Sequence, residues 1–122
     1  MRGDVGRAML DQLDAVAAAG EHHRVIFEND HVRVLDTIIR PGEQTALHTH
    51  VWAGTLQIIS WSEFERFDQQ GHLIFASSQL SSRPPIGAVL WSEALAAHSF
   101  RNIGTQDFHV ISTELKTQLL EG

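Results

Sequence analysis

The chain has 122 residues, a formal net charge of −6 at neutral pH and no cysteine. This length suits one domain with its own core, and the lack of cysteine excludes a disulfide framework, a zinc–thiolate site and a thiol nucleophile. One lysine and eight scattered arginines argue against a nucleic-acid partner, because binding to phosphates needs clustered cations.

The first predicted element is a helix over residues 8–19. Leu10, Leu13 and Val16 share one face of it, and Gly20 stands where a helix C′ residue is common. No segment is long and apolar enough to be a membrane span, and the first residues lack the order of a secretory signal. We therefore expect a cytoplasmic protein without membrane contact. Its N-terminal helical extension, residues 1–22, would pack outside a β domain formed by residues 23–122.

After the helix the sequence changes to short runs of β-branched and apolar residues separated by turn residues. The predicted strands cover residues 24–28, 32–40, 45–50, 55–61, 63–67, 72–76, 88–91, 99–103 and 108–115. Many short strands at this spacing predict an all-β sandwich or barrel rather than a parallel sheet. Several strands carry apolar residues on both faces, so the outer face needs cover from the helix or from a second copy of the chain, which favours a homodimer.

The most informative segment is His48-Thr49-His50, which lies in one predicted strand. Side chains alternate faces along a strand, so the two imidazoles point the same way and could share one cation. His98 lies in another strand-like segment, where it shares a face with Phe100. The alternative is that all three are satisfied polar residues, since eight histidines in the chain pair by chance fairly often.

The context of these histidines resembles the two motifs of the cupin superfamily. The first motif is matched by Gly42 and, after five residues, His48-Thr49-His50; the second is matched by Gly87, Glu93, His98 and Asn102. The resemblance extends over residues 25–116 and implies a cupin-type barrel, a jelly roll or double-stranded β-helix, with a divalent metal held by His48, His50 and His98. One departure is clear: Gly54 and Thr55 stand where the family usually has a metal-binding glutamate.

The resemblance implies a metal-binding protein for a small molecule, with iron, zinc, nickel or manganese as the divalent ion. One function it suggests is that of a three-histidine non-haem iron dioxygenase acting on a small anionic or sulfur-containing metabolite. The alternative is a non-catalytic binding or sensory module with a degenerate metal site. The missing glutamate favours the alternative, whereas the retained histidines and Asn102 favour the enzyme.

Four further residues are expected near the site. Trp52 shares the parity of His50, Thr55 stands at the glutamate position, Gln57 shares the face of Thr55, and Phe100 follows His98. The alternative for Gln57 is that it only makes a hydrogen bond within the barrel. The alternative for Trp52 is that it only packs in the core or at a dimer contact. The other histidines, His22, His23, His31, His72 and His109, are expected at element ends or in surface contexts. Arg40 and Arg101 could bind a carboxylate of a ligand, but single arginines on strands are usually solvated. Glu93 is expected to be a solvated acid in a loop.

Overall fold

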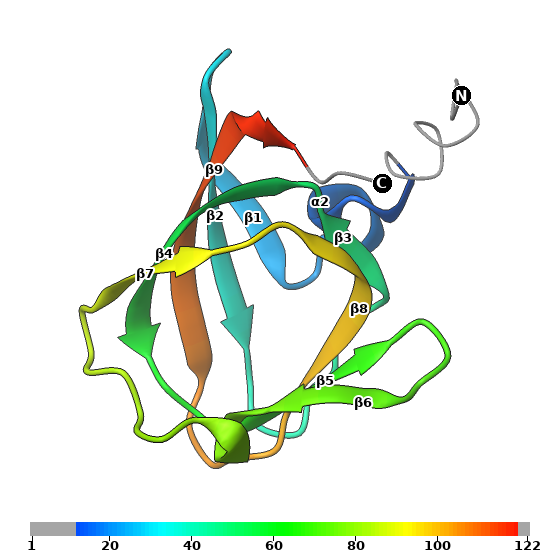
Figure 1. Ribbon diagram of the computed structural model, residues 1–122, viewed down its shortest axis with the longest axis vertical. Helices are drawn as coiled ribbons and strands as arrows, with labels where there is room; N and C mark the ends of the chain where they lie inside the picture. The colour runs from blue at the N-terminus through cyan, green and yellow to red at the C-terminus, as the bar shows by residue number, and fades with distance from the viewer. Residues whose placement is uncertain (1–11, 120–122) are drawn as a thin grey trace.

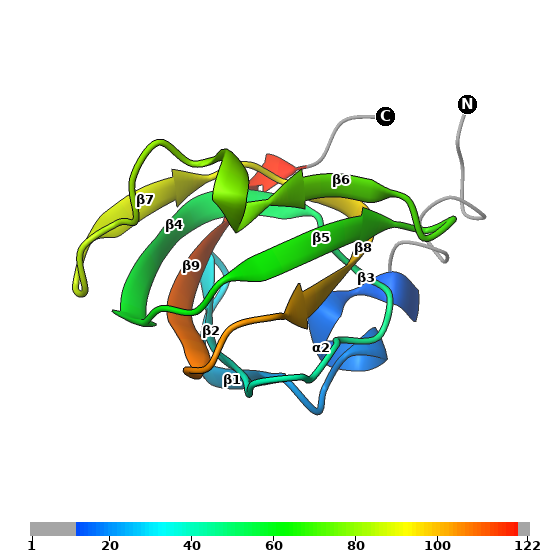
Figure 2. The ribbon, with the colours of Figure 1, turned by 90° about the horizontal axis from the view of Figure 1, so that it is seen from below.

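The computed structural model describes residues 12–119, in which two β-sheets are accompanied by the short α-helix α2 (Ala15–Ala18) and a 3-10 helix, η1 (Ser77–Gln79) (Figures 1 and 2). The larger sheet has the strand order β1-β2-β9-β4-β7, and the smaller one β3-β8-β5-β6. The strands are β1 (His23–Glu28), β2 (Val32–Ile39), β3 (His48–His50), β4 (Trp52–Ser60), β5 (Phe64–Asp68), β6 (Leu73–Ala76), β7 (Val89–Ser92), β8 (Leu95–Asn102) and β9 (Phe108–Leu119). The all-β, jelly-roll prediction is confirmed.

Alternation along β2 and β9 determines what faces the interior. In β2 every second residue is buried, from Arg33 to Ile39. Pairing of β2 with β9 places Arg33 opposite Glu114 and Leu35 opposite Ser112, so the polar part of this inner face lies at one end of the barrel. At the other end, an apolar cluster fills the space between the sheets; it consists of Ile39, Ile58, Trp61, Phe64, Phe100, Phe108 and Val110.

Both glycines that open the two motifs adopt a backbone conformation that other residues rarely adopt. The φ angles are 82° at Gly42 and 88° at Gly87. Asn102 of the second motif has a structural role. It is fully buried; its amide donates to the carbonyls of Ile39 and Gln106, and its oxygen accepts from the Ser62 hydroxyl and the Gly104 amide. It therefore satisfies buried backbone groups where strand β8 ends.

The helix expected over residues 8–19 is not continuous in the part of the chain that the structure describes. Helix α2 covers only Ala15–Ala18, and Asp14 precedes it with a φ of −53° and a ψ of 142°. Asp14 makes a bridge to Thr49 of β3 and caps α2 through a hydrogen bond from the Val16 amide. A side chain that can accept from the backbone favours such a cap over a helix interior. Residues 8–11 lie outside the described residues.

The outer face of the larger sheet is partly apolar. One row across its five strands consists of Phe27, Val34, Thr113, Thr55 and Trp91. Phe27 is 55% exposed and Trp91 is 53% exposed, while helix α2 packs elsewhere, against β1 and β3. Among residues 12–119, no helix has both the length and the apolar character needed to cross a membrane.

Candidate metal centre

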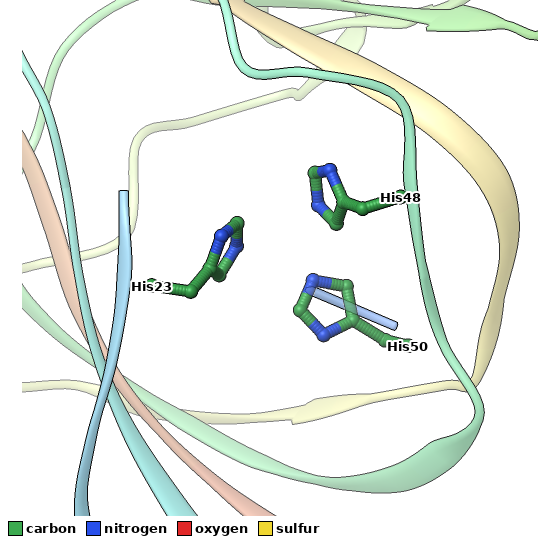
Figure 3. Close-up of side chains that lie close together, drawn as sticks. All are labelled: His23, His48 and His50. Carbon is green, nitrogen blue, oxygen red and sulfur yellow. The ribbon is translucent and has the colours of Figure 1, made fainter. Parts of the chain in front are cut away.

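Three histidine rings from two strands face one another. His23 begins β1, and His48 and His50 form the ends of β3. Figure 3 shows the ring of His23 pointing from one side toward the rings of His48 and His50 on the other. One nitrogen of each ring lies within 4.8 Å of the other two. At this spacing three imidazoles are positioned to bind one metal ion.

His98 lies next to this group. It is the partner of His48 in the ladder between β3 and β8, and the centroids of these two rings are 4.4 Å apart. Its centroid is 5.7 Å from that of His50. The structure therefore brings His48, His50 and His98 together, as the motif spacing predicts, and it adds His23. His23 lies at an element end, as expected, but it is buried rather than in a surface context, with only 5% of it exposed.

The four rings are all held by hydrogen bonds at the same nitrogen. Nδ1 of His23 donates to the Ala19 carbonyl at 3.0 Å, Nδ1 of His48 to the Ala46 carbonyl at 2.7 Å, and Nδ1 of His98 to the Ala96 carbonyl at 2.8 Å. Nδ1 of His50 lies 2.9 Å from the Glu114 carboxylate. A carbonyl oxygen or an ionised carboxylate can only accept, so each Nδ1 carries a proton.

This arrangement leaves the other nitrogen ready for a metal. A neutral imidazole has one N–H, so Nε2 of each ring keeps its lone pair. A ligand imidazole whose other nitrogen donates to a carbonyl or carboxylate is the usual pattern at protein metal sites. The side chains present therefore fit a divalent cation bound by imidazole nitrogens.

The electrostatics of the site favour the same state. Burial lowers the pKa of His23 and His50 to about 3 and that of His98 to about 2, and neighbouring imidazoles add to the effect. Burial also lowers the pKa of His48. All four rings are therefore neutral near pH 7, the form in which imidazole binds a metal.

Two ion pairs and a hydrogen bond connect His50 to the N-terminal segment. Glu114 is 3% exposed; one of its oxygens accepts from His50, and the other accepts from Nε of Arg33 at 2.8 Å. The remaining nitrogens of Arg33 donate to both carboxylate oxygens of Asp14 at 2.8 and 2.7 Å. Burial raises the pKa of Glu114, and the charge of Arg33 opposes that rise. Negative and positive groups thus alternate from Asp14 through Arg33 to Glu114, and the chain of contacts ends on the neutral ring of His50.

Glu114 brings a carboxylate next to the histidines, although the usual glutamate of the first motif is missing. The equivalent position falls at Gly54 or Thr55 of β4, and Gly54 is paired with Glu114 in the ladder to β9. A Cβ atom on Gly54 would lie 1.9 Å from the carbonyl oxygen of Thr113, so a side chain does not fit there without movement of the backbone. Thr55 is paired with Thr113, in the row that faces outward. The carboxylate near the histidines therefore comes from β9, and it contacts a ring rather than the metal position.

The histidines belong to the wall of a cavity of about 100 Å³. Trp52 and Phe100, which are expected near the site, also border this cavity; Thr55 borders it too, from a row that otherwise faces outward. Trp52 lies against the guanidinium of Arg33, with the guanidinium carbon 5.0 Å from the ring centroid. Gln57 does not border the cavity; it is exposed, and its amide donates to the Gly87 carbonyl at 3.3 Å. Arg40 and Arg101 are exposed as well.

Three residues that border the cavity are not predicted from the sequence. His23 follows a helix end and a glycine, a context typical of a loop, so its sequence gives no sign of burial. Glu114 and Arg66 each lie in a strand with apolar or aromatic neighbours at alternate positions. That alternation was the available signal, because Glu114 has the parity of Phe108 and Val110, and Arg66 has the parity of Phe64.

No protein-family model matches the chain, and neither does any curated protein sequence. Solved structures do match. A cupin domain from Bordetella pertussis Tohama I is 17% identical, with a TM-score of 0.61 over 76% of this chain and 90% of that one. An RmlC-like cupin with a double-stranded β-helix fold from Methanocaldococcus jannaschii is 14% identical, with a TM-score of 0.53 over 76% and 77%.

The polyketide cyclase RemF from Streptomyces resistomycificus is 15% identical, with a TM-score of 0.51 over 84% of this chain and 71% of that one. At such low sequence identity, the structural similarity establishes the fold alone, and the chemistry has to be argued from the residues of the site. The structural matches agree with the resemblance that the two histidine motifs indicate. The chain is a small protein with the cupin fold, a double-stranded β-helix.

Proposed function

We propose that this protein binds one divalent metal ion through His23, His48, His50 and His98, and that a small molecule binds to the ion inside the cavity. The observation that carries the proposal is the common hydrogen-bond pattern of the four rings. Each Nδ1 donates to an oxygen, which leaves each Nε2 unprotonated. Four independent surface histidines would have no reason to share this pattern or to be buried together.

The donor set narrows the choice of ion. Neutral imidazoles suit zinc, iron and nickel, and manganese is a weaker candidate because it prefers oxygen ligands. Four neutral ligands leave the full charge of a dipositive ion in place. In a six-coordinate ion, they would also leave two positions for a ligand or water. Both features favour a small anionic ligand that binds through one or two atoms.

The enzyme we would test first is a non-haem iron dioxygenase of a small anionic or sulfur-containing metabolite. What supports it is an all-nitrogen ligand set beside a cavity that has an apolar wall, including Phe100 and Phe108. Iron would supply the redox chemistry, and the chain would supply a neutral, partly enclosed site. The alternative is a metal-dependent binding or sensory module, which needs the same site but no turnover.

Elemental analysis of protein purified without a histidine tag tests the proposed metal site. We expect close to one divalent ion per chain in the wild type, and loss of the ion from the double variant H48A/H98A. His72→Ala is the matched control, since the His72 side chain is 79% exposed. Equal metal in all three proteins, or none in the wild type after reconstitution, would contradict the proposal.

Oxygen consumption by the iron-loaded protein separates the two functions. A panel of small carboxylic acids and thiols is incubated with the wild type and with H48A/H98A. Consumption that depends on one class of compound and is lost in the variant supports the dioxygenase. Saturable binding of such a compound without consumption of oxygen supports the binding module.

A further inference from the structure

Arg66 places a positive charge in the wall of the same cavity. It lies in the middle of β5 and pairs with Phe100 of β8, so both side chains are on the inner face of the smaller sheet. Both residues border the cavity together with the four histidines.

The guanidinium of Arg66 has no anionic partner among residues 12–119. Its Nε atom is buried and has no hydrogen-bond partner, and no ion pair of the described residues includes it. Arg33 in the same barrel shows the contrast, since it pairs with two carboxylates. A partly buried charge without a partner is costly, and buried charges in proteins are usually paired.

Aromatic rings hold the guanidinium in place without using its N–H groups. Its central carbon lies 5.6 Å from the centroid of Phe75 and 5.9 Å from that of Phe64. Such cation–π contacts stabilise the charge in part and orient it. They leave the N–H edge free for an acceptor, and a carboxylate matches that edge with two oxygens.

The other charges of the cavity do not neutralise Arg66. Among the described residues that border the cavity, Glu114 is the only acid, and its two oxygens already accept from Arg33 and His50. Burial lowers the pKa of Arg66, and its charge contributes to the lowered pKa values of His48, His50 and His98. A metal on these histidines would make the cavity still more positive. No described acid of the cavity is therefore free to pair with Arg66, and an anionic ligand would supply the missing negative charge.

We infer that Arg66 binds the carboxylate of the small ligand whose second donor atom, a hydroxyl, carbonyl or thiol group, binds the metal. This inference rests on the proposed metal site, and it narrows the ligand class from any anion to small carboxylic acids with a second donor. Arg66 is then the residue that selects the charged acid over its neutral amide.

The test uses cobalt-loaded protein and a pair of small probes, glycolate and its neutral counterpart glycolamide. Isothermal titration measures both affinities for the wild type, Arg66→Met and Arg66→Gln. The second variant keeps a polar side chain in case methionine prevents folding. Arg101→Met is the control, because Arg101 lies one position from Phe100 on β8 but is exposed.

We expect either Arg66 variant to bind glycolate at least about tenfold more weakly, while its glycolamide affinity and its cobalt content stay at the wild-type level. Arg101→Met should match the wild type throughout. Glycolate affinity within about twofold of the wild type in an Arg66 variant would overturn the inference, as would failure of the cobalt-loaded wild type to bind glycolate. Failure of the wild type to take up cobalt would instead contradict the proposed metal site, so the two failures are distinguishable.

Discussion

The carboxylate of Glu114, on β9 of the larger sheet, accepts a hydrogen bond at 2.9 Å from Nδ1 of His50, on β3 of the smaller sheet. This contact fixes the ring orientation and the tautomer of His50. It also places a negative charge beside Nδ1 of the ring, which would make Nε2 a better donor to a metal. The two sheets are therefore coupled through the site as well as through the apolar core.

The first prediction concerns the charge of Glu114. Glu114→Gln keeps an oxygen that accepts from His50 but removes the negative charge, so metal affinity should fall by about tenfold or more. Competition with a chelator of known affinity measures the change. Glu93→Gln is the control, since Glu93 is an exposed acid that bonds only to the Trp91 ring among the described residues. An unchanged affinity in Glu114→Gln would mean that the contact does not influence the metal.

Asp14 should stabilise the fold through Arg33. Burial raises its pKa, but the hydrogen bonds and charge of Arg33 outweigh that effect, and the pKa of Asp14 is lowered. The stabilisation is therefore present at neutral pH and is lost as the pH falls below about 4. Asp14→Asn should reduce the free energy of unfolding by about 1–3 kcal/mol at pH 7, measured in urea. Asp30→Asn, on an exposed residue, should be neutral. Equal stability of the two variants would contradict the prediction.

The metal-free protein should lose stability in mild acid. The histidine pKa is about 6.5 in an unfolded chain, whereas burial lowers the pKa of His23 and His50 to about 3 and that of His98 to about 2 in the fold. Because the folded values are lower, the unfolded chain takes up protons first. Stability is complete above about pH 6.5 and is lost progressively toward about pH 3.

Each of these histidines lowers the free energy of unfolding by about 1.4 kcal/mol per pH unit in that interval, so together they remove about 4 kcal/mol per unit. Urea denaturation of chelator-treated protein between pH 7 and about pH 5 measures the slope. His23→Gln should reduce the slope by about one proton, while His72→Gln should leave it unchanged. A stability that is constant over this interval would show that the four rings are not buried together.

Assembly as a homodimer stays a prediction, and the outer face of the larger sheet gives it a location. Phe27 and Trp91 lie at the two ends of one outward row and are more than half exposed. Light scattering should give twice the chain mass of 13.6 kDa, and Phe27→Glu should shift the protein to monomers. Leu73→Glu is the control, because Leu73 is 54% exposed on β6 of the other sheet. A wild-type mass of one chain would contradict the prediction.

The strand pattern and the pair His48 and His50 could be predicted from the sequence because alternation is a local property. All nine expected strands are present with shifted ends; β4, for example, begins at Trp52 rather than Thr55. The break at Asp14 was not predictable from helix-forming residues alone. It depends on two partners distant in the sequence, Thr49 and Arg33.

The rest of the site depends on which strands meet across the barrel. His23 contacts His48 only because β1 lies at the edge of one sheet and β3 at the edge of the other, close enough for centroids 4.6 Å apart. Glu114 and Arg66 could be assigned to inner faces by parity, but their partners could not. Arg33 is paired because residues 19 and 81 positions away in the sequence bring carboxylates to it. The Nε atom of Arg66 finds no partner among the described residues, and its position in the strand could not reveal that difference.

The close approach of β4 to β9 at Gly54 limits how this site can change. A single substitution could exchange one imidazole for another donor, because the histidine rings border a cavity. Recovering a glutamate at the usual place is different, since the first atom of any side chain at Gly54 would collide with the main chain of Thr113. The spacing of two neighbouring strands would have to widen first. The lack of a carboxylate at this position is thus set by backbone geometry, and a designer who wants one there has to rebuild the sheet or start from another strand.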